Sequence, residues 1–455
     1  MTEGVKTLMG SPKRAILKLS IPMIIAMSAH TLYNLVDAIW VSGLGPKAIA
    51  AVGYVFPFFF FAMALSSGIG VGGGSAVSRK IGAQDKAGAD QVATHTIVIM
   101  LITSGLIAGG MFFITKPILA TLGAGDTLPL AYDYAKIIFS GIVLLFFNQI
   151  SISLLRSEGD AKRSMYLMLT GVILNTILDP IFIYTFGLGV SGAAYATVLS
   201  MSFVSIISFY WLFFQKNTYV SFKFRSFKFN RSVIWDISRV GLPSIVSQAS
   251  MSLMSLALIT IITKVGGSEG VAIYTTGWRI IGLAIMPILG IATAVTSVSG
   301  AAYGSRNYEN IKKAYFYAIK IGVVAEVILS ILIFIFAKQF SWIFTWSELT
   351  KTIRPGLINF LRIICLMMIT APVGMASAAM FEGTGKGLYS LMMTILRTLI
   401  FTVPFAWLGG IYFNGGLTGV WWGMSVAGLT YLPIAFGWST NYLHNLMKTN
   451  VSLTK

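Results

Sequence analysis

Two aspartates lie inside long apolar stretches of the sequence. Asp37 stands within HTLYNLVDAIW, and Asp179 stands within LNTILDPIFIY. An acid in the middle of a bilayer costs roughly 2.5–3.5 kcal/mol on insertion scales, so its presence predicts a function. Two carboxylates that lie close together in an apolar cleft cannot both ionise easily. The pair therefore predicts a group that carries a proton, and its oxygens offer ligands for Na⁺ as the alternative.

Polar side chains accompany both aspartates at the spacing of helical turns. Asn175 stands one turn before Asp179, and Thr197 adds a neutral hydroxyl from the next apolar segment. The helix face that carries Asp37 also presents three polar side chains, which are His30, Tyr33 and Asn34. The predicted ion-coupling residues are Asp37, Asn175, Asp179 and Thr197. A helix-packing role for the acids, each satisfied by a hydroxyl or an amide, is the structural alternative, and an internal hydrogen bond is the alternative for the histidine.

Membrane-spanning helices are needed to hold these residues. The chain has 455 residues, of which 56% are hydrophobic and only 11% are charged, and its mean hydropathy is +0.80. Soluble domains contain about 25% charged residues, so the charges here are too few to coat a soluble surface. A helix crosses a bilayer in about 20 residues. Segments of that length, apolar on all sides, exclude a β-barrel and predict an all-α polytopic protein of twelve helices: 15–40, 48–72, 91–114, 132–155, 164–186, 191–214, 237–263, 272–299, 314–337, 356–380, 388–412 and 418–443.

The basic residues indicate the orientation of these helices. The formal net charge of +18 invites a nucleic-acid interpretation. With the N-terminus inside, however, the cytoplasmic segments and adjoining helix ends hold 22 Lys and Arg residues, Lys216 and Lys455 among them, and the outer segments hold seven. This asymmetry is the positive-inside rule. It predicts a multi-pass protein of the cell membrane with both termini in the cytoplasm, and it argues against nucleic acid as a partner.

The two halves of the chain repeat the same landmarks. Pro22 in LSIPMIIAMS matches Pro243 in VGLPSIVSQAS at an offset of 221, and Pro180 matches Pro404 at an offset of 224. Each copy holds six helices, so both copies insert the same way up and are related by a pseudo-two-fold axis along the membrane normal. Transporters built in this way place their sites near the middle of the membrane. A repeat protein without transport, such as a scaffold, is the alternative.

The repeat also defines the predicted domains and indicates which of them carries the ion-coupling acids. The boundaries are an N-lobe at 1–214, a cytoplasmic linker at 215–236 and a C-lobe at 237–455. Asp37 corresponds to Leu258 and Asp179 to Val403, so the prolines recur and the acids do not. A residue needed only for the fold should recur in both halves. The acids are therefore assigned to an ion-coupling function of the N-lobe.

Pro22 is the predicted hinge of the first helix. A proline removes one helical hydrogen bond, here the bond to the Lys18 carbonyl, and so allows the helix to bend. We expect protonation of Asp37 to change this bend. A static kink is the alternative.

Basic residues within apolar runs occur in the second half: Arg279, Lys320, Arg362 and Arg397. Glu326 is a candidate ion-pair partner for them. Long basic side chains in such places commonly extend to the membrane interface or form structural ion pairs. Recognition of an anionic group is the alternative.

Other signals in the sequence carry little weight. GIGVGG at Gly68–Gly73 has the spacing of a dinucleotide-binding loop, but no predicted strand precedes it, so it is expected to allow close helix packing. His95 and His444 stand alone near the ends of predicted helices and are expected at the surface. No Cys/His cluster, nucleophile motif or phosphate-binding loop is present in the sequence. It therefore predicts no cofactor, no metal other than Na⁺ at the aspartates, and no enzymatic activity.

Four segments carry a resemblance to a known family: LSIPMIIAMSAHTLYNLVDAIWVSGLGPKAIAAVG, LLRSEGDAKRS, LNTILDPIFIYTFGLGVSGAAYAT and AAYGSRN. They resemble the multidrug and toxic compound extrusion (MATE) family, especially its archaeal and DinF-like members, and the similarity covers nearly the whole chain. The resemblance implies the MATE/MOP-type fold, a twelve-helix, two-lobed, V-shaped antiporter. It also implies the export of cationic amphiphilic drugs in exchange for H⁺ or Na⁺.

The resemblance also implies roles for individual residues. The family's ion site falls on Asp37, Asn175, Asp179 and Thr197, and its bending proline falls on Pro22. The polar residues that line the family's cavity fall on Tyr33, Asn34 and Asn148, and His30 joins this predicted cavity at a position where close relatives have Gln. Some branches carry acids in their seventh and eighth helices, and the matching positions here lack them.

The sequence thus predicts a cation-coupled (H⁺ or Na⁺) antiporter that exports cationic amphiphilic compounds by alternating access, acting as a monomer. The first alternative is a flippase for lipid-linked oligosaccharide of the same superfamily, in which the arginines of the second half would bind a pyrophosphate. The second alternative is a membrane-embedded enzyme, for which the sequence offers no pair of nucleophile and base.

Overall fold

The computed structural model describes residues 2–215, 217–346 and 348–453, so Lys216 and Lys455 of the predicted cytoplasmic set lie outside it. Within these residues the chain is helical and contains no strand. Ten helices are long and apolar enough to cross a membrane, and the bent pair α5 and α6 gives an eleventh. The predicted all-α polytopic class is confirmed.

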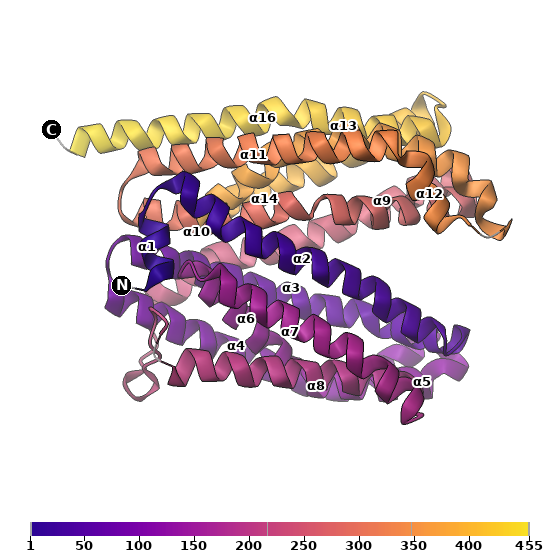
Figure 1. Cartoon of the computed structure of the whole chain (residues 1–455), viewed down its shortest axis with the longest axis horizontal. Coiled ribbons are helices and arrows are strands. Elements are labelled where there is room, and N and C mark those ends of the chain that lie inside the picture. Colours follow the sequence, from indigo (N-terminus) through magenta and orange to yellow (C-terminus); the bar gives the residue numbers. More distant parts are fainter. Residues whose placement is uncertain (1, 216, 347, 454–455) are drawn as a thin grey trace. The chain divides into compact units, whose positions relative to one another are not determined.

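The helices that overlap the predicted segments run side by side in each half of the chain (Figure 1). In the first half they are α2 (Pro12–Ser42), α3 (Pro46–Gly82), α4 (Lys86–Thr121), α5 (Leu128–Ser140), α6 (Ile142–Ser157), α7 (Ala161–Pro180) and α8 (Gly189–Phe209). In the second half they are α9 (Arg231–Ala284), α10 (Met286–Gly304), α11 (Tyr308–Ile335), α13 (Arg354–Gly383), α14 (Gly387–Ile395) and α16 (Gly416–Leu453). The shorter α-helices are α1 (Glu3–Met9), α12 (Ala337–Phe344) and α15 (Val403–Trp407).

Two glycines produce breaks that the hydropathy pattern does not reveal. The predicted helix at 132–155 is bent by 47° at Gly141, where it divides into α5 and α6. A Cβ on Gly141 would lie only 2.8 Å from Cγ2 of Val198, so glycine allows α8 to approach closely there. Gly267 has a φ of 57°, in the left-handed region that favours glycine. It marks a kink within α9, which therefore covers one predicted helix and the start of the next.

The chain forms two compact units. Unit 1 comprises Met1–Leu8 and Ile25–Ile245, and unit 2 comprises Met9–Ile24 and Val246–Lys455. Helix α2 thus passes from unit 2 to unit 1 just after Pro22, and α9 passes from unit 1 to unit 2 just after its repeat-related proline, Pro243. The lobe and linker boundaries drawn from the sequence remain predictions.

Unit 1 is a helix bundle in which α3 packs against α4 and α6, and α7 packs against α8 (Figure 1). Its glycine-rich stretch makes this packing close. A Cβ on Gly70 would lie 3.1 Å from Cβ of Ser153 on α6, and one on Gly73 would overlap Thr96 on α4. Ser153 also donates a 2.6 Å hydrogen bond to the Gly70 carbonyl. The predicted packing role of Gly68–Gly73 is confirmed.

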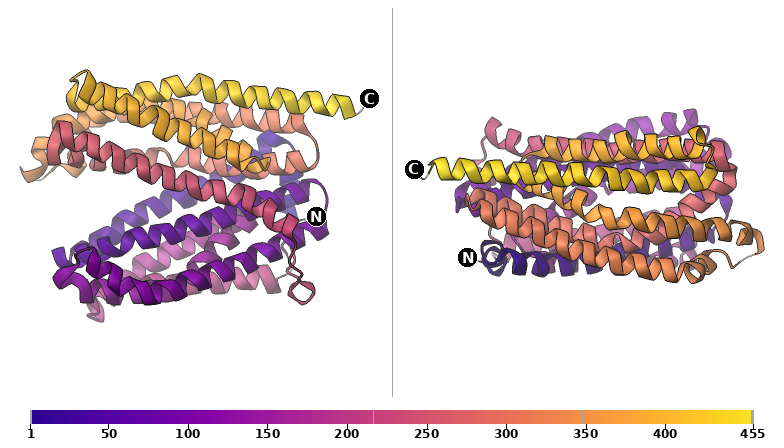
Figure 2. Two further views of the ribbon diagram at one scale, coloured as in Figure 1. Left: turned by 180° about the vertical axis from the view of Figure 1, so that it is seen from behind. Right: turned by 90° about the horizontal axis from the view of Figure 1, so that it is seen from above.

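Unit 2 is built around α13, which packs against α10, α11 and α16 (Figure 2). Buried aromatic rings join these helices to α9. Phe360 and Trp421 meet edge to face with ring centroids 4.8 Å apart, and Tyr274 stacks on Trp421 at 6.1 Å. Such aromatic pairs contribute about 0.5–1.5 kcal/mol each beyond the area they bury.

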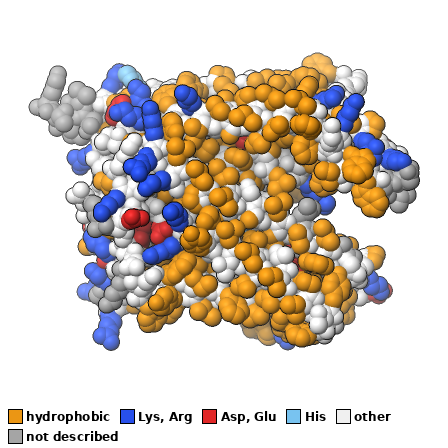
Figure 3. Space-filling model, viewed as in Figure 1, with side chains coloured by type: hydrophobic (Ala, Val, Ile, Leu, Met, Phe, Trp, Pro, Cys, Tyr) orange, Lys and Arg blue, Asp and Glu red, His pale blue; other side chains and the backbone are white. Residues whose placement is uncertain are grey.

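The surface of the helices matches a membrane environment. Hydrophobic side chains cover the middle of the helices, and Lys and Arg side chains gather at helix ends, most densely at those near the N-terminus (Figure 3). Large apolar side chains such as Phe113, Ile206 and Leu256 are more than 60% exposed, which is expected for contact with lipid.

Two acidic side chains of unit 1 accept hydrogen bonds from the backbone of the segment that joins the two halves of the chain. The two carboxyl oxygens of Glu158 accept hydrogen bonds from the backbone N–H groups of Tyr219 and Val220 at 2.7 and 2.9 Å. Asp90 accepts another from the N–H of Ser221 at 2.7 Å. Burial raises the pKa of Glu158 to about 7, although the two N–H donors act in the opposite direction.

His95 lies under the same segment, and the prediction that it lies at the surface is wrong. Its side chain is 1% exposed, and its ring packs on that of Phe227 with centroids 4.7 Å apart. Nδ1 lies 2.8 Å from the Gln91 carbonyl, and Nε2 accepts a hydrogen bond of 3.1 Å from the N–H of Asn230. This burial could not be predicted from the sequence, because Phe227 and Asn230 lie far along the chain from His95.

Candidate ion-coupling site

The two aspartates singled out in the sequence meet within unit 1, from α2 and α7. The carboxyl groups of Asp37 and Asp179 lie close enough to interact directly. Asp179 is fully buried, and its Oδ1 accepts a 2.8 Å hydrogen bond from Nδ2 of Asn175. Among the described residues its Oδ2 has no hydrogen-bond partner. A buried polar atom without a partner costs roughly 1–3 kcal/mol, so the pair offers an oxygen that a bound ion can satisfy.

The end of α7 fixes the position of Asp179. Pro180 closes the α-helix, and the backbone continues as a π-helical turn over Ile181–Thr185. A Cβ on Gly192 of α8 would lie 2.5 Å from the Phe182 carbonyl oxygen, so only glycine lets α8 pack against this turn. The proline and the glycine therefore bring α8 beside the acid.

Tyr33 of α2 connects the predicted ion-coupling residues of three helices. Its hydroxyl donates a hydrogen bond to Oδ1 of Asn175 on α7. It also lies within reach of the Thr197 side chain on α8. The Thr197 hydroxyl itself donates a 2.9 Å hydrogen bond to the Ala193 carbonyl. The structure thus gathers Asp37, Asn175, Asp179 and Thr197 around one tyrosine.

Tyr134 of α5 belongs to the same cluster and was missed in the sequence. Its hydroxyl lies near enough to both aspartates to interact electrostatically with their carboxyl groups. Its ring packs with the residues around Val41 and Ile183. The only sequence signal was its place beside the buried stripe Ala131, Ala135 and Ile138 of α5, and this pattern does not distinguish a site residue from a packing residue.

The structure places His30 and Asn34 of the predicted cavity beside Tyr33 on α2, and it places Asn148 elsewhere, on α6. His30 lies on the helix face of Tyr33, with ring centroids 6.0 Å apart, and its Nδ1 lies 3.4 Å from Nδ2 of Asn34. Asn148, in contrast, is tied into the packing of α6 against α8. Its Nδ2 donates to the Met201 carbonyl at 2.9 Å, and its Oδ1 accepts from Ser205 at 2.8 Å. The structure therefore shows Asn148 satisfied by helix packing, and its role in a cavity remains a prediction.

Comparison with known proteins identifies the family. A family model described as MatE matches residues 22–181 and again residues 243–408. The chain belongs to the MatE family. The two matches to MatE begin at Pro22 and Pro243, which supports the duplication inferred from the sequence.

Named relatives of this MatE chain are transporters. It is 27% identical over 421 residues to the multidrug export protein MepA of Staphylococcus saprophyticus, covering 91% of this chain and 90% of MepA. It is 46% identical to a multidrug resistance MATE family transporter of the MOP superfamily solved in an outward-facing conformation, covering 98% of this chain and 99% of that one with a TM-score of 0.96. A MOP superfamily transporter from Pyrococcus furiosus Vc1, whose binding pocket is described as having reverse polarity that suggests a different function, is also 46% identical, with coverage of 98% and 99% and a TM-score of 0.95.

These matches confirm the predicted MATE/MOP-type fold, and they place this MatE protein among transporters rather than enzymes. They do not favour the lipid-linked oligosaccharide flippase. Two basic residues of the second half that motivated it, Arg279 and Arg362, are exposed side chains rather than members of a buried cluster.

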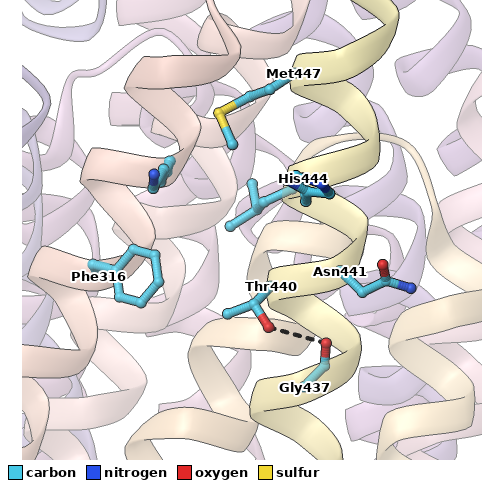
Figure 4. A pocket seen from close by; sticks show the side chains of 8 residues that line it. Phe316, Gly437, Thr440, Asn441, His444 and Met447 are labelled. Carbon is cyan, nitrogen blue, oxygen red and sulfur yellow. Dashed lines mark hydrogen bonds between the residues drawn. The ribbon is translucent and has the colours of Figure 1, made fainter.

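A pocket of this MatE chain lies in unit 2, between α11 and α16. It is a cavity of about 410 Å³ to which Phe316, Thr440, His444 and Met447 contribute (Figure 4). His444 is exposed, as predicted. No acid lines this cavity, and the described residues contain no group of three or more His, Cys, Asp or Glu side chains that could hold a metal ion. The aspartate cluster of unit 1 therefore remains the candidate coupling site.

Proposed function

We propose that this MatE protein is a multidrug efflux transporter that exports cationic amphiphilic compounds across the cell membrane by alternating access, in exchange for H⁺. The observation that carries the proposal is the buried pair of Asp37 and Asp179, with Asn175 and Tyr33 hydrogen-bonded around it. The likeness to MepA and to MATE transporters supports the drug-export part.

The charge of the site suits a cationic substrate. Within the described residues, no ion pair involves Asp37 or Asp179; the salt bridges of unit 1 lie elsewhere, as between Arg79 and Asp236. Two close carboxyl groups without a basic partner cannot both carry a charge unless a cation joins them. A bound drug cation and a bound proton are therefore alternative ways to neutralise the same pair, which is the basis of exchange.

The hydrogen-bond pattern favours a proton over Na⁺ as the coupling ion. Hard cations are held by several oxygens that point toward one centre. Here Asn175 turns an N–H toward Asp179, while its oxygen accepts from Tyr33. The Thr197 hydroxyl donates to a backbone carbonyl. This pattern leaves the second oxygen of Asp179 available to take a proton, whereas Asn175 would have to turn its amide oxygen toward the acids to become a ligand of Na⁺.

The exchange cycle follows from this competition. The pair, with one carboxylate ionised, attracts a cationic compound from the cytoplasmic side, and the second carboxyl group ionises as the cation binds. A proton from outside then neutralises one carboxylate and weakens the attraction, so that the compound leaves. One charge that moves through about 150 mV supplies about 3.5 kcal/mol, which corresponds to a concentration ratio of a few hundred.

The conformational part of the cycle is assigned to Pro22. It interrupts the hydrogen bonds of α2 just before this helix passes from unit 2 to unit 1, so a bend there would reorient the segment that carries Asp37. Release of a bound dye on acidification is the test, comparing wild type with Pro22→Ala. Slower release in the variant is expected, and unchanged release would refute the hinge.

The topology completes the proposal. Both termini lie in the cytoplasm, because the basic residues gather in the segments on that side. The protein acts as a monomer, since each chain carries its own complete aspartate pair.

Efflux of a cationic dye from proteoliposomes tests the proposed function. An imposed pH gradient is compared with an imposed Na⁺ gradient for wild type, Asp37→Asn and the control Asp126→Asn, which alters an exposed acid. We expect the pH gradient alone to drive efflux in wild type and the control, and Asp37→Asn to be inactive. Efflux driven only by Na⁺ would replace the proton with Na⁺. Normal efflux by Asp37→Asn would refute the mechanism.

A further inference from the structure

A third carboxyl group is buried inside unit 2, in the half of the chain that lacks the aspartate pair. Glu326 lies within α11 and is 0% exposed. Both of its carboxyl oxygens lack a hydrogen-bond partner among the described residues. An ionised carboxylate in such a place would lose its hydration without compensation, at a cost of several kcal/mol. The geometry therefore requires the neutral, protonated carboxyl group.

The packing that encloses Glu326 is tight on its N-terminal side. Gly322 stands one turn earlier on the same face of α11. A Cβ there would lie 2.9 Å from Cδ1 of Ile288 on α10 and 3.0 Å from Cβ of Pro372 on α13. A side chain at this position would force Ile288 or Pro372 to shift, and the contact of the three helices closes one end of the surroundings of Glu326.

The other end is closed by a pair of hydrogen bonds between α11 and α13. Ser330 stands one turn after Glu326 and donates a 3.1 Å hydrogen bond to the Cys365 carbonyl. The Cys365 thiol lies 3.3 Å from the Ser330 carbonyl and donates in return. Apolar side chains such as Met368 pack into the core beside these two hydrogen bonds.

The register of the two helices places a free acceptor near Glu326. Gly322 faces Pro372 and Ser330 faces Cys365, so Glu326 lies between them, at the level of Met368. Because Pro372 has no N–H, the Met368 carbonyl has lost its helical donor. A protonated carboxyl group can donate to this carbonyl after a change of rotamer, and an ionised one cannot.

The basic residues that the sequence suggested as partners of Glu326 do not pair with it. Lys320 is exposed, on the opposite stripe of α11 that also carries Val324 and Ile328. Arg362 of α13 is exposed, and its guanidinium lies over the ring of Phe334, 5.4 Å from the centroid. Arg279 is exposed as well, and among the described residues neither oxygen of Glu326 has a partner, so the predicted ion pair is absent.

The other titratable groups of the surrounding helices are engaged elsewhere. The Cys365 thiol bonds to backbone carbonyls of α11 and α13. The Tyr431 hydroxyl of α16 donates to the sulfur of Met393 at 3.4 Å. Helix α10 carries no charged side chain. Within the part of the chain that the structure describes, neither oxygen of Glu326 thus receives a hydrogen bond that would stabilise a negative charge.

We propose that Glu326 is a second proton-binding site, located in the C-terminal half of the chain. It holds its proton while α10, α11 and α13 are packed together, and it gives the proton to water when this seam opens during the transport cycle. The first part rests on the packing alone, and the second part rests on the proposed proton-coupled function. The step is a simple dissociation in which the carboxyl O–H bond breaks and a carboxylate and a hydrated proton form.

Infrared spectroscopy of the purified full-length protein at neutral pH tests whether Glu326 is protonated. The carbonyl band of protonated carboxyl groups is compared between wild type, Glu326→Gln and two controls. These are Asp37→Asn, in the other half, and Glu309→Gln, an acid of α11 that is 54% exposed. We expect Glu326→Gln to lose one component of this band that both controls retain. Identical bands in wild type and Glu326→Gln would overturn the proposal.

The role in transport is tested by counting protons taken up per cationic dye exported from proteoliposomes. Gln keeps the shape of a protonated Glu, so Glu326→Gln is expected to export dye with a proton-to-dye ratio lower by about one, while Glu309→Gln keeps the wild-type ratio. An unchanged ratio would overturn the release step. If wild type itself shows no proton exchange, the proposed function fails, and the infrared comparison still decides the protonation of Glu326.

Discussion

The N-terminal and C-terminal halves of this MatE chain surround their buried acids with different hydrogen-bond partners. Asp179 accepts a hydrogen bond from Asn175, lies against Asp37 and belongs to a cluster that Tyr33 completes. Glu326 is buried to the same degree but has no partner for either oxygen among the described residues. The first arrangement supplies donors to a carboxylate, and the second supplies none.

This difference shows how a duplicated scaffold can diverge in chemistry. The repeat keeps Pro22 with Pro243 and Pro180 with Pro404, because each copy needs the same breaks in its helices. The acids have no counterparts at the matching positions, Leu258 and Val403, as expected if they serve the proposed function rather than the fold. A cluster with donors can change charge while its helices stay packed. A carboxyl group without partners can change charge only when its surroundings open.

The sharpest test of the comparison is efflux of a cationic dye by Asp179→Asn and by Glu326→Gln. We expect Asp179→Asn to reduce pH-driven efflux by at least ~100-fold, equivalent to about 2.7 kcal/mol, because the pair can no longer exchange drug for proton. Glu326→Gln should slow efflux by less than ~5-fold, since the N-terminal site remains whole. Equal losses in the two variants would contradict the division of labour.

Glu158 extends the comparison to a buried acid outside the membrane-spanning helices. Its pKa is raised from 4.5 to about 7 by burial, so the folded protein binds this proton more tightly than the unfolded chain. The stabilisation is present below pH 4.5 and is lost as the pH rises through about 7, up to roughly 3 kcal/mol. Glu158→Gln should therefore gain stability relative to wild type between pH 5 and pH 8, measured by denaturation at each pH. A difference that does not vary with pH would contradict the assignment.

Replacing each buried acid with an apolar residue should change the stability of the protein in a different direction. Asp179→Leu leaves Asn175 without its acceptor and should lower the free energy of unfolding by about 2 kcal/mol. Glu326→Met fills a similar volume and removes two unsatisfied oxygens, so it should be neutral or stabilising by about 1 kcal/mol. Thermal unfolding in detergent checks both variants. A clear destabilisation by Glu326→Met would reveal a partner for this carboxyl group.

The smallest effect is expected for the hydroxyl of Tyr33. Tyr33→Phe removes the hydrogen bond to Asn175, worth about 1 kcal/mol, and should reduce dye efflux by roughly 5-fold. Tyr166→Phe is the matched control, because Tyr166 is 52% exposed. Efflux of Tyr33→Phe equal to that of the control would remove this tyrosine from the site.

The sequence predicted the helices well, because long apolar segments and the distribution of Lys and Arg report the membrane directly. It missed the bend at Gly141 and the merging of two helices across Gly267, since a single glycine within an apolar run does not reveal its φ or its neighbours. It also missed α1, a short helix that precedes the first predicted membrane segment.

The residues that the structure brings together in the candidate site are mostly ones whose type alone carries a signal in the sequence. Acids and amides inside apolar runs are rare, so Asp37, Asn175 and Asp179 stood out. Tyr134 could not be found in this way, because a tyrosine in an apolar helix is ordinary. The surroundings of Glu326 depend on the contact of α11 with α13, which no spacing within α11 reveals.

The most direct test of the central claim is the binding of a cationic dye to purified protein as a function of pH. If the aspartate pair exchanges drug for proton, wild type should bind the dye roughly 5–150-fold more weakly at acidic than at alkaline pH. The double variant Asp37→Asn, Asp179→Asn should bind it with an affinity that does not vary with pH. Retention of the wild-type pH dependence by the double variant would contradict the assignment of coupling to the N-terminal half.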